Sequence, residues 1–211
     1  MKLMPKYKIN FINEGYRRYY AKHRTEILRA IDKCYKYGDF VLRGELEKFE
    51  KSLAKFLKVK YVIGVNSGTD ALRVSYKCLG LKPEDEVITV SHVFIAPIEE
   101  IVHWGAKPVL IDVGYDGLMD TDLIEKVITK KTVGIVPVHL SGKVCDMDAI
   151  MKIAKKHKLW VVEDACQALG AKYKGKMAGT IGNAGCFSHI APKTLGVGGD
   201  AGTVVTNNKD L

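Results

Sequence analysis

One lysine stands apart from the other basic residues, in the glycine-rich stretch FSHIAPKTLGVGGDAG at residues 187–202. Lysine and arginine make up 33 of the 211 residues, so residues 177–208 should contain about five of them. They contain one, Lys193. An amine held away from water and from other cations tends to lose its proton, and a neutral amine can attack a carbonyl carbon to form a Schiff base. Lys193 is therefore a candidate nucleophile, with an ordinary surface lysine in a loop as the alternative.

A second candidate is an anion site in VNSGTDAL, residues 65–72, which follows an expected strand and opens an expected helix. Gly68 allows close approach of the backbone, and Ser67 and Thr69 carry hydroxyl groups. Together with the N–H groups at the start of a helix, these features suit a phosphate. The alternative is an ordinary N-cap, made by Ser67 or Thr69.

A third candidate is Asp164, within VVEDACQALGA at residues 161–171. It ends an expected buried strand beside Val161 and Val162, where a carboxylate is costly unless it meets a cation or several hydrogen-bond donors. A capping or ion-paired aspartate is the alternative. The functional interpretation is favoured by position, because ligands of open α/β sheets bind at the carboxyl ends of the strands.

An amine, a buried carboxylate and a phosphate site are the three groups that pyridoxal phosphate requires. Its aldehyde needs the lysine, its phosphate needs the helix N-terminus, and its ring nitrogen needs a carboxylate that keeps it protonated. An aromatic side chain would also have to cover the ring. In SHVFIAP, residues 91–97, Phe94 is the candidate and His92 the alternative.

The rhythm of apolar residues predicts the elements that would position these groups. Residues 1 to about 60 have helical spacing, as in RTEILRAIDKCYKYG. Beyond them, short runs rich in Val and Ile alternate with helical patterns, which is typical of βαβ units and a mostly parallel sheet. We expect an α/β fold of three layers, α/β/α, with about seven strands. The apolar runs are YVIGV (61–65), EVITV (86–90), KPVLIDV (107–113), VGIVPVHL (133–140), LWVVEDA (159–165), and two more near 186–187 and 202–205.

Composition limits the classes of protein. A chain with 47% hydrophobic residues can bury a core, but it has no apolar run that could span a bilayer, and MKLMPKYKIN lacks the features of a secretory signal. The five cysteines are odd in number and contain no CxxC pair, which indicates reduced thiols and no metal site. The net charge of +9 could attract nucleic acid, but the basic residues are mixed with acidic ones, as in LRGELEKFEKSLAKFLKVK. We therefore expect a cytoplasmic protein that binds neither membranes nor nucleic acid.

From about Gly38 to Leu211 the chain resembles the DegT/DnrJ/StrS family of nucleotide-sugar aminotransferases. The resemblance rests on an ordered set of motifs: ELEKFEKSLAKFL, VIGVNSGTDAL, DEVITVSHVFIAP, GAKPVLIDV, VPVHLSG, VVEDACQALGA, FSHIAPKTLG and GDAGTVVTN. It implies the large domain of a fold type I transferase that uses pyridoxal 5'-phosphate. It also implies amino transfer, with L-glutamate as the expected donor, to a nucleotide-linked 4-keto or 3-keto-6-deoxyhexose. A homodimer or a higher homo-oligomer is expected.

The resemblance assigns a role to each candidate residue. Lys193 would bind the cofactor's aldehyde covalently and later carry a proton between the α-carbon and C4′. Asp164 would pair with the pyridinium nitrogen, Gln167 would hydrogen-bond the phenolic oxygen, and Phe94 would stack on the ring. The phosphate would be held by Gly68, Thr69 and Ser188.

Some features of the chain separate branches of this family. Members that dehydrate sugars with pyridoxamine phosphate have histidine where Lys193 stands, so amino transfer is favoured over the dehydratase alternative. The sequence of the segment GDFVLRGELEKFE is more similar to the 3-aminotransferase branch of the family. The chain departs from the usual FSF-x-P-x-K pattern, because His189 replaces an aromatic residue and the proline is Pro192. Ser141 stands where the family pattern PVHLYG has tyrosine.

The expected domains are an N-terminal helical segment at residues 1–60, packed on the large domain, and a cofactor-binding large domain at residues 61–211. The family's small C-terminal domain is expected to be absent. One alternative is therefore a truncated, inactive member that acts as a binding or regulatory protein. Another is a DNA-binding regulator, but the sequence contains no helix-turn-helix, zinc finger or basic stripe.

Overall fold

The computed structural model describes residues 11–38 and 40–211, which form two compact units divided between Lys48 and Phe49. The division falls inside helix α2 (Gly44–Leu57), so this helix begins in the first unit and ends in the second. The expectation for residues 1–10 lies outside the described residues. No helix in the described ranges is both long enough and apolar enough to cross a bilayer.

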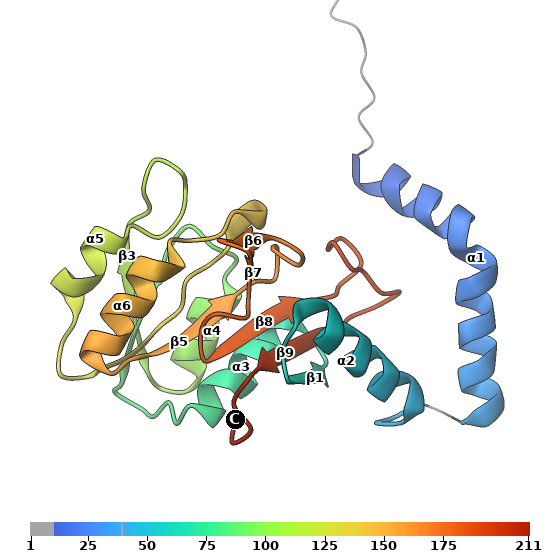
Figure 1. Cartoon of the computed structure of the whole chain (residues 1–211), viewed down its shortest axis with the longest axis horizontal. Coiled ribbons are helices and arrows are strands. Elements are labelled where there is room, and N and C mark those ends of the chain that lie inside the picture. Colours follow the sequence, from blue (N-terminus) through green and yellow to red (C-terminus); the bar gives the residue numbers. More distant parts are fainter. Residues whose placement is uncertain (1–10, 39) are drawn as a thin grey trace, which may run out of the picture. The chain divides into compact units, whose positions relative to one another are not determined.

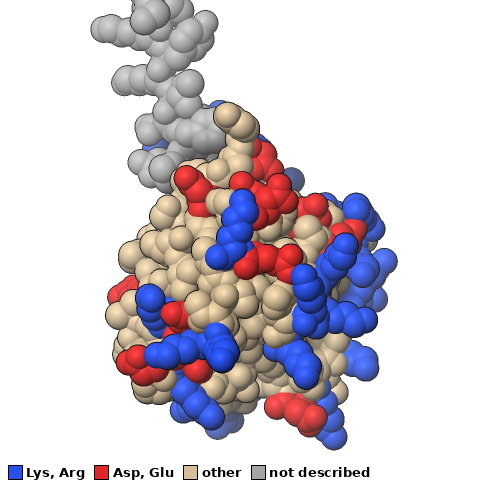
Figure 2. All heavy atoms as spheres, turned by 90° about the vertical axis from the view of Figure 1, so that its left-hand side faces the viewer, with Lys and Arg blue, Asp and Glu red and all other residues tan. Residues whose placement is uncertain are grey.

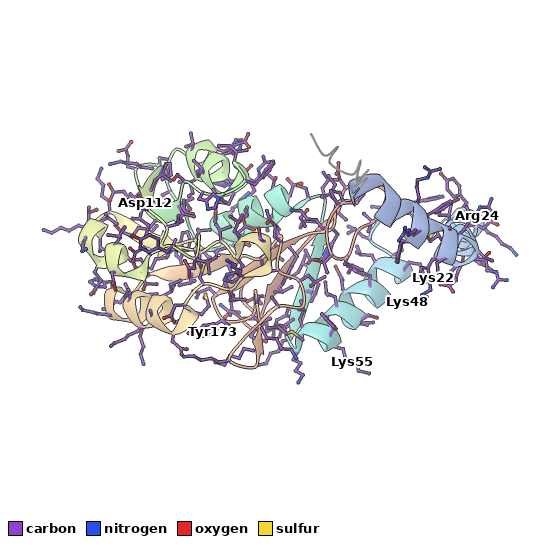
Figure 3. All side chains as sticks on the ribbon, turned by 90° about the horizontal axis from the view of Figure 1, so that it is seen from above. Lys22, Arg24, Lys48, Lys55, Asp112 and Tyr173 are labelled. Atoms are coloured by element: carbon purple, nitrogen blue, oxygen red, sulfur yellow. The ribbon has the colours of Figure 1, made fainter. Side chains whose placement is uncertain are left out.

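The first unit consists of helix α1 (Phe11–Tyr37) and the start of α2. The predicted helix at RTEILRAIDKCYKYG is present, and α1 begins well before it. Glu45 receives Nζ of Lys33 at 2.7 Å and Nζ of Lys48 at 2.8 Å. Lys48 is labelled in Figure 3. These ion pairs lower the pKa of the exposed Glu45 carboxyl to about 2, chiefly through its hydrogen bond with Lys33.

The second unit is built on a seven-stranded sheet with the order β1-β9-β8-β5-β4-β2-β3 (Figure 1). Neighbouring strands run parallel except β9, which is antiparallel to both β1 and β8. The predicted seven-stranded, mostly parallel sheet is therefore confirmed. Its strands are β1 (Tyr61–Val65), β2 (Glu86–Val90), β3 (Lys107–Ile111), β4 (Thr132–Ile135), β5 (Trp160–Asp164), β8 (Ala184–Ser188) and β9 (Gly202–Thr206).

Helices cover both faces of this sheet. Helices α3 (Gly68–Cys78) and α4 (Ala96–His103) enclose one core with side chains of β2, β5, β8 and β9. Helices α5 (Thr121–Ile124) and α6 (Met147–His157) enclose a second core, and the end of α2 encloses a third. The expected three-layer α/β/α architecture is confirmed.

Strand β5 shows how the two faces are separated. Val161 belongs to the core under α6, whereas Val162 belongs to the core under α3. Because successive side chains of a strand point to opposite faces, the next two residues are separated in the same way. Glu163 lies on the α6 side and Asp164 lies on the α3 side.

Short elements differ from the sequence-based expectation. The predicted strand at 133–140 ends at Ile135, and Pro137 beyond it has no backbone N–H for a further ladder bond. The predicted helix at DLIEKVI is one turn of α-helix followed by a 3₁₀ turn, η1 (Glu125–Val127). A hairpin of β6 (Lys172–Tyr173) and β7 (Lys176–Met177) was not predicted, because two-residue strands carry no alternation pattern.

Basic and acidic side chains lie next to one another on the face shown in Figure 2. Glu125 receives Nζ of Lys156 at 2.7 Å and Nε2 of His157 at 2.6 Å. Lys174 pairs with Asp148. Close by, Tyr173 (labelled in Figure 3) donates its hydroxyl to Asp146 at 2.6 Å. At these positions the lysines are paired on solvated surfaces, as the mixed charge pattern predicts.

Candidate active site

A cavity of about 520 Å³ lies in the second unit, beyond the carboxyl ends of β2, β5 and β8. Its walls come from the start of α3, the segment after β2 and the segments after β4, β5 and β8. All seven residues predicted from the sequence line it, although they are spread over positions 68 to 193 of the chain. They are Gly68, Thr69, Phe94, Asp164, Gln167, Ser188 and Lys193.

The start of α3 forms one wall of the cavity. Ser67 is the N-cap of this helix, and its hydroxyl accepts the Asp70 amide at 3.0 Å. The N-cap interpretation of Ser67 is therefore correct, and it is compatible with an anion site. The first N–H groups of the helix, at Gly68 and Thr69, have no acceptor within the helix and can bind an anion.

Gly68 lies where the backbone of α3 passes close to other parts of the wall. A Cβ atom at this position would be 2.8 Å from Sγ of Cys166 and 2.9 Å from Cβ of Ser188. Any larger residue would push the start of α3 away from β8. The glycine therefore brings the helix N-terminus and Ser188 together at the cavity.

Asp164 is almost fully buried at the end of β5, and it lines the cavity. The backbone amide of Cys166 donates to Oδ1 at 3.1 Å. Burial raises the pKa of Asp164, and the hydrogen bonds from Cys166 and the charge of Lys193 oppose that effect without cancelling it. A carboxyl in this environment would gain from a further cation placed in the cavity.

Gln167 and Phe94 occupy the wall as the sequence predicts. Oε1 of Gln167 accepts the Ser141 amide at 2.9 Å, which leaves the NH₂ group of Gln167 as a donor. Phe94 is 66% exposed. His92, the alternative aromatic residue, is not among the lining residues, and its Nδ1 lies 3.3 Å from the carbonyl oxygen of Gly117.

Lys193 lines the cavity from a loop that runs over the surface. Lys193 is partly buried, whereas the other residues between 190 and 200 are exposed. The side chain of Lys193 is therefore partly removed from water, within a loop that is otherwise exposed.

Two glycines near Lys193 lie where the backbone passes close to another part of the chain. A Cβ at Gly196 would be 2.3 Å from the carbonyl oxygen of Ala191, and one at Gly202 would be 2.2 Å from that of Ser67. Both glycines allow close contact within the protein backbone. At Gly198 and Gly199 a Cβ would meet nothing within 4 Å.

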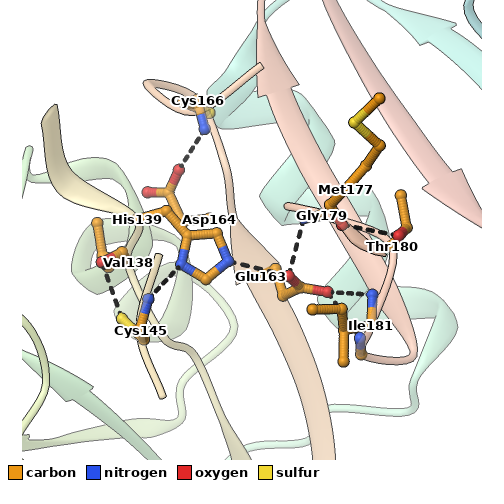
Figure 4. Close-up of polar contacts among 11 residues, drawn as sticks. Val138, His139, Cys145, Glu163, Asp164, Cys166, Met177, Gly179, Thr180 and Ile181 are labelled. Carbon is orange, nitrogen blue, oxygen red and sulfur yellow. Dashed lines mark hydrogen bonds and ion pairs between the residues drawn. The ribbon is translucent and has the colours of Figure 1, made fainter. Parts of the chain in front are cut away.

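Sequence analysis gave no role to His139, which is fully buried and also lines the cavity. Its Nε2 donates to Oε2 of Glu163 at 2.9 Å, and its Nδ1 accepts the Cys145 amide at 3.3 Å (Figure 4). Because Nδ1 accepts a hydrogen bond, the ring proton is on Nε2. The Glu163 carboxylate also accepts backbone amides at 2.8, 2.6 and 2.6 Å, from Gly179, Ile181 and Gly182. The one signal in the sequence is that His139 is a polar residue near the end of the predicted strand at 133–140.

Known proteins resemble the chain over most of its length. It is 40% identical over 193 residues to a protein named "Pleiotropic regulatory protein" from Geobacillus stearothermophilus, covering 91% of this chain and 52% of the relative. It is also 40% identical over 192 residues to the dTDP-3-amino-3,4,6-trideoxy-alpha-D-glucose transaminase of Micromonospora megalomicea, covering 90% and 51%. The chain thus spans about half the length of these relatives.

Solved structures resemble the fold as well. The crystal structure of S. venezuelae DesV in complex with a ketimine intermediate has a TM-score of 0.89 and 40% identity, covering 92% of this chain and 53% of that one. The DegT/DnrJ/EryC1/StrS aminotransferase family matches residues 21–211, so the match begins earlier than the expected start near Gly38. Because this match includes every residue that lines the cavity, the chain belongs to the DegT/DnrJ/EryC1/StrS aminotransferase family.

Proposed function

We propose that this chain is the cofactor-binding part of a pyridoxal-phosphate-dependent aminotransferase acting on a nucleotide-linked keto sugar. The observation that supports it is a single cavity that contains an amine, a buried carboxylate and a helix N-terminus, from Lys193, Asp164 and the start of α3. The family is one of aminotransferases. The whole enzyme's reaction is part of the proposal, because the chain spans about half of its relatives.

The residues that line the cavity fit this cofactor by their chemistry. The free N–H groups at Gly68 and Thr69, with the Ser188 hydroxyl, are donors for a phosphate. Asp164 is a buried carboxyl whose pKa is raised by burial. A protonated ring nitrogen beside it would stabilise its ionised form. Gln167 retains a free NH₂ donor for a phenolic oxygen.

Pyridoxal phosphate supplies an electron sink that stabilises negative charge on the substrate carbon. The protein must hold this group, keep its ring nitrogen protonated and move one proton. Nζ of Lys193 is the amine that can bind the aldehyde and, when free, take up and release that proton. The carboxylate of Asp164 holds the proton on the ring nitrogen through a charge-assisted hydrogen bond. Phe94, which lines the cavity, would pack against the ring of the bound cofactor and limit the entry of water.

The proposed substrates follow from the family and from one relative. L-Glutamate is the proposed amino donor, and a nucleotide-linked deoxyhexulose is the acceptor. The Micromonospora relative is named for a sugar with a 3-amino group, which supports a keto group at C3. We include a homodimer and a cytoplasmic location in the proposal. Exposed apolar side chains at the cavity, such as Phe94 at 66% and Ile190 at 38%, support association with a second copy.

The test is the visible absorption spectrum of the purified protein with pyridoxal phosphate, before and after borohydride reduction. We expect a bound yellow chromophore that reduction fixes onto Lys193, located by peptide mapping. Lys193→Ala should lose it, whereas the exposed control Lys176→Ala should keep it. If the chromophore persists in Lys193→Ala at full yield, the assignment of the amine is wrong.

Turnover needs a separate experiment. Bleaching of the chromophore by L-glutamate, with release of 2-oxoglutarate, would support amino transfer. A folded protein that binds the cofactor on Lys193 but does not exchange amino groups would instead support the inactive family member. Absence of any chromophore in a folded sample would contradict cofactor binding by this chain.

A further inference from the structure

His189 is the first residue after β8 and is fully buried within the second unit. Its Nδ1 lies 3.3 Å from the carbonyl oxygen of Leu195, and its Nε2 lies 3.0 Å from the hydroxyl of Thr203. The edge of its ring packs against Phe49, with centroids 5.6 Å apart and planes at 89°. A single buried side chain therefore connects the loop after β8 with strand β9.

The contacts of His189 determine which nitrogen carries its proton. A carbonyl oxygen can only accept a hydrogen bond, so Nδ1 of His189 must carry the proton that goes to Leu195. Nε2 is then free to accept the hydroxyl proton of Thr203. Burial lowers the pKa of His189, and the hydrogen bond with Leu195 opposes this effect. In the neutral form of the ring, each nitrogen therefore has a hydrogen-bond partner.

The loop that His189 contacts is the one that carries Lys193. Among residues 190–200 none is classed as fully buried, so this loop has no interior side chain of its own. The loop's backbone is held at Val197, whose amide donates to the carbonyl of His189 at 2.8 Å, and at Lys193, whose amide donates to Ile190 at 2.9 Å. The side-chain contact from His189 to Leu195 fixes the same loop from inside the protein.

We propose that His189 is a positioning residue: its Nδ1–H bond to Leu195 and its anchorage on Thr203 hold the loop so that Lys193 lies in the cavity. The effect on the reaction rests on the function proposed above, but the effect on the loop does not. Loss of the bond to Leu195 should leave the fold in place and let the loop move away from the cavity.

Three variants separate hydrogen bonding from packing. His189→Phe keeps an aromatic ring against Phe49 but removes both polar contacts. His189→Asn keeps a donor close to the position of Nδ1, whereas His189→Gln places its polar atoms near the position of Nε2 and toward Thr203. The proposal therefore expects His189→Asn to rescue the loop and His189→Gln to fail.

The first readout is hydrogen exchange of the Lys193 and Val197 amides in cofactor-free protein, with circular dichroism as the check on folding. Loss of one hydrogen bond should speed their exchange about tenfold in His189→Phe, with His189→Asn within about twofold of the parent. The second readout is the rate at which pyridoxal phosphate is fixed by borohydride on Lys193. We expect about a tenfold slower rate in His189→Phe and rescue by His189→Asn.

The outcomes distinguish the two proposals. Exchange in His189→Phe within about twofold of the parent would overturn the positioning role. Should His189→Phe fail to fold, equal loop exchange in the Asn and Gln variants would overturn it instead. If the parent fixes no cofactor on Lys193, the proposed function fails, and the exchange data still decide the role of His189.

Discussion

Glu163 and Asp164 are consecutive residues of β5 that serve opposite faces of the sheet. Glu163 accepts hydrogen bonds from the turn at residues 179–182 and from His139, on the α6 side. Asp164 lines the cavity, on the α3 side. The carboxylate of Glu163 therefore accepts four hydrogen bonds, whereas that of the adjacent Asp164 accepts the amide of Cys166 and faces the cavity. Their substitutions should have opposite consequences for stability and for binding.

Asp164→Asn should weaken binding of pyridoxal phosphate without destabilising the fold. The variant loses a charge-assisted hydrogen bond to the ring nitrogen, which corresponds to about tenfold to a hundredfold in affinity. It also removes a buried carboxyl, so the free energy of unfolding at neutral pH should stay the same or rise. The measurements are a spectroscopic titration with the cofactor and urea unfolding of cofactor-free protein. The exposed substitution Asp210→Asn is the control, and equal affinity in both variants would contradict the role of Asp164.

Glu163→Gln should destabilise the protein. The amide has one oxygen where the carboxylate offers two, so some of the four donors now bound to Glu163 are left buried without an acceptor. We expect a loss of about 3 kcal/mol in the free energy of unfolding, measured by urea denaturation. The matched control is Glu84→Gln, at an exposed carboxylate that pairs with Lys131 on the surface. Similar midpoints for the two variants would argue against the contribution of Glu163.

Ser67→Ala should remove the N-cap of α3 but keep the anion site. The hydroxyl that accepts the Asp70 amide is lost, which should cost about 1 kcal/mol of stability in urea unfolding. The N–H groups of Gly68 and Thr69 remain in the helix, so the affinity for pyridoxal phosphate should change by less than about threefold. A loss of binding far larger than the loss of stability would show that the Ser67 hydroxyl contacts the ligand directly.

The contribution of His189 to stability should decline in acid. Its pKa in the folded protein is lowered, chiefly by burial, so the unfolded chain binds a proton more readily than the folded one. The stabilisation is complete above the unfolded pKa of about 6.5 and is lost as the pH falls toward the lower folded pKa. The check is the difference in unfolding free energy between the parent and His189→Phe, measured at several pH values between about 5 and 8. The difference in unfolding free energy should become smaller at acidic pH. A larger difference at acidic pH would contradict a lowered pKa of His189.

Much of the fold can be predicted from the sequence because β1, β2 and β5 are short segments rich in valine and other apolar residues, with polar residues at or just beyond the end of each. The candidate site follows from the same pattern, since Asp164 and Ser67–Gly68 stand where predicted strands end and parallel strands share that edge. The structure places these residues, with Lys193, at one cavity.

Contacts between distant segments could not be predicted in this way. His139 and Glu163 are 24 residues apart, and Glu163 binds the turn that begins 16 residues after it. No local pattern specifies such a pairing. The β6–β7 hairpin depends on left-handed backbone at Lys174 and Gly175, which glycine alone indicates only weakly.

The position of β9 also has a consequence for the order of folding. β1 is an edge strand, and its one neighbour in the sheet is β9, with Tyr61 opposite Thr206. In sequence, β1 lies near the start of the second unit and β9 near its end. A pairing over such a distance closes a long loop and is slow to form. Residues 202–206 would have to leave the ribosome before β1 could join the sheet. Because α3 begins just after β1 and packs on β9, the proposed phosphate site would assemble only after β9 has formed, and phosphate binding would report the pairing of β1 with β9.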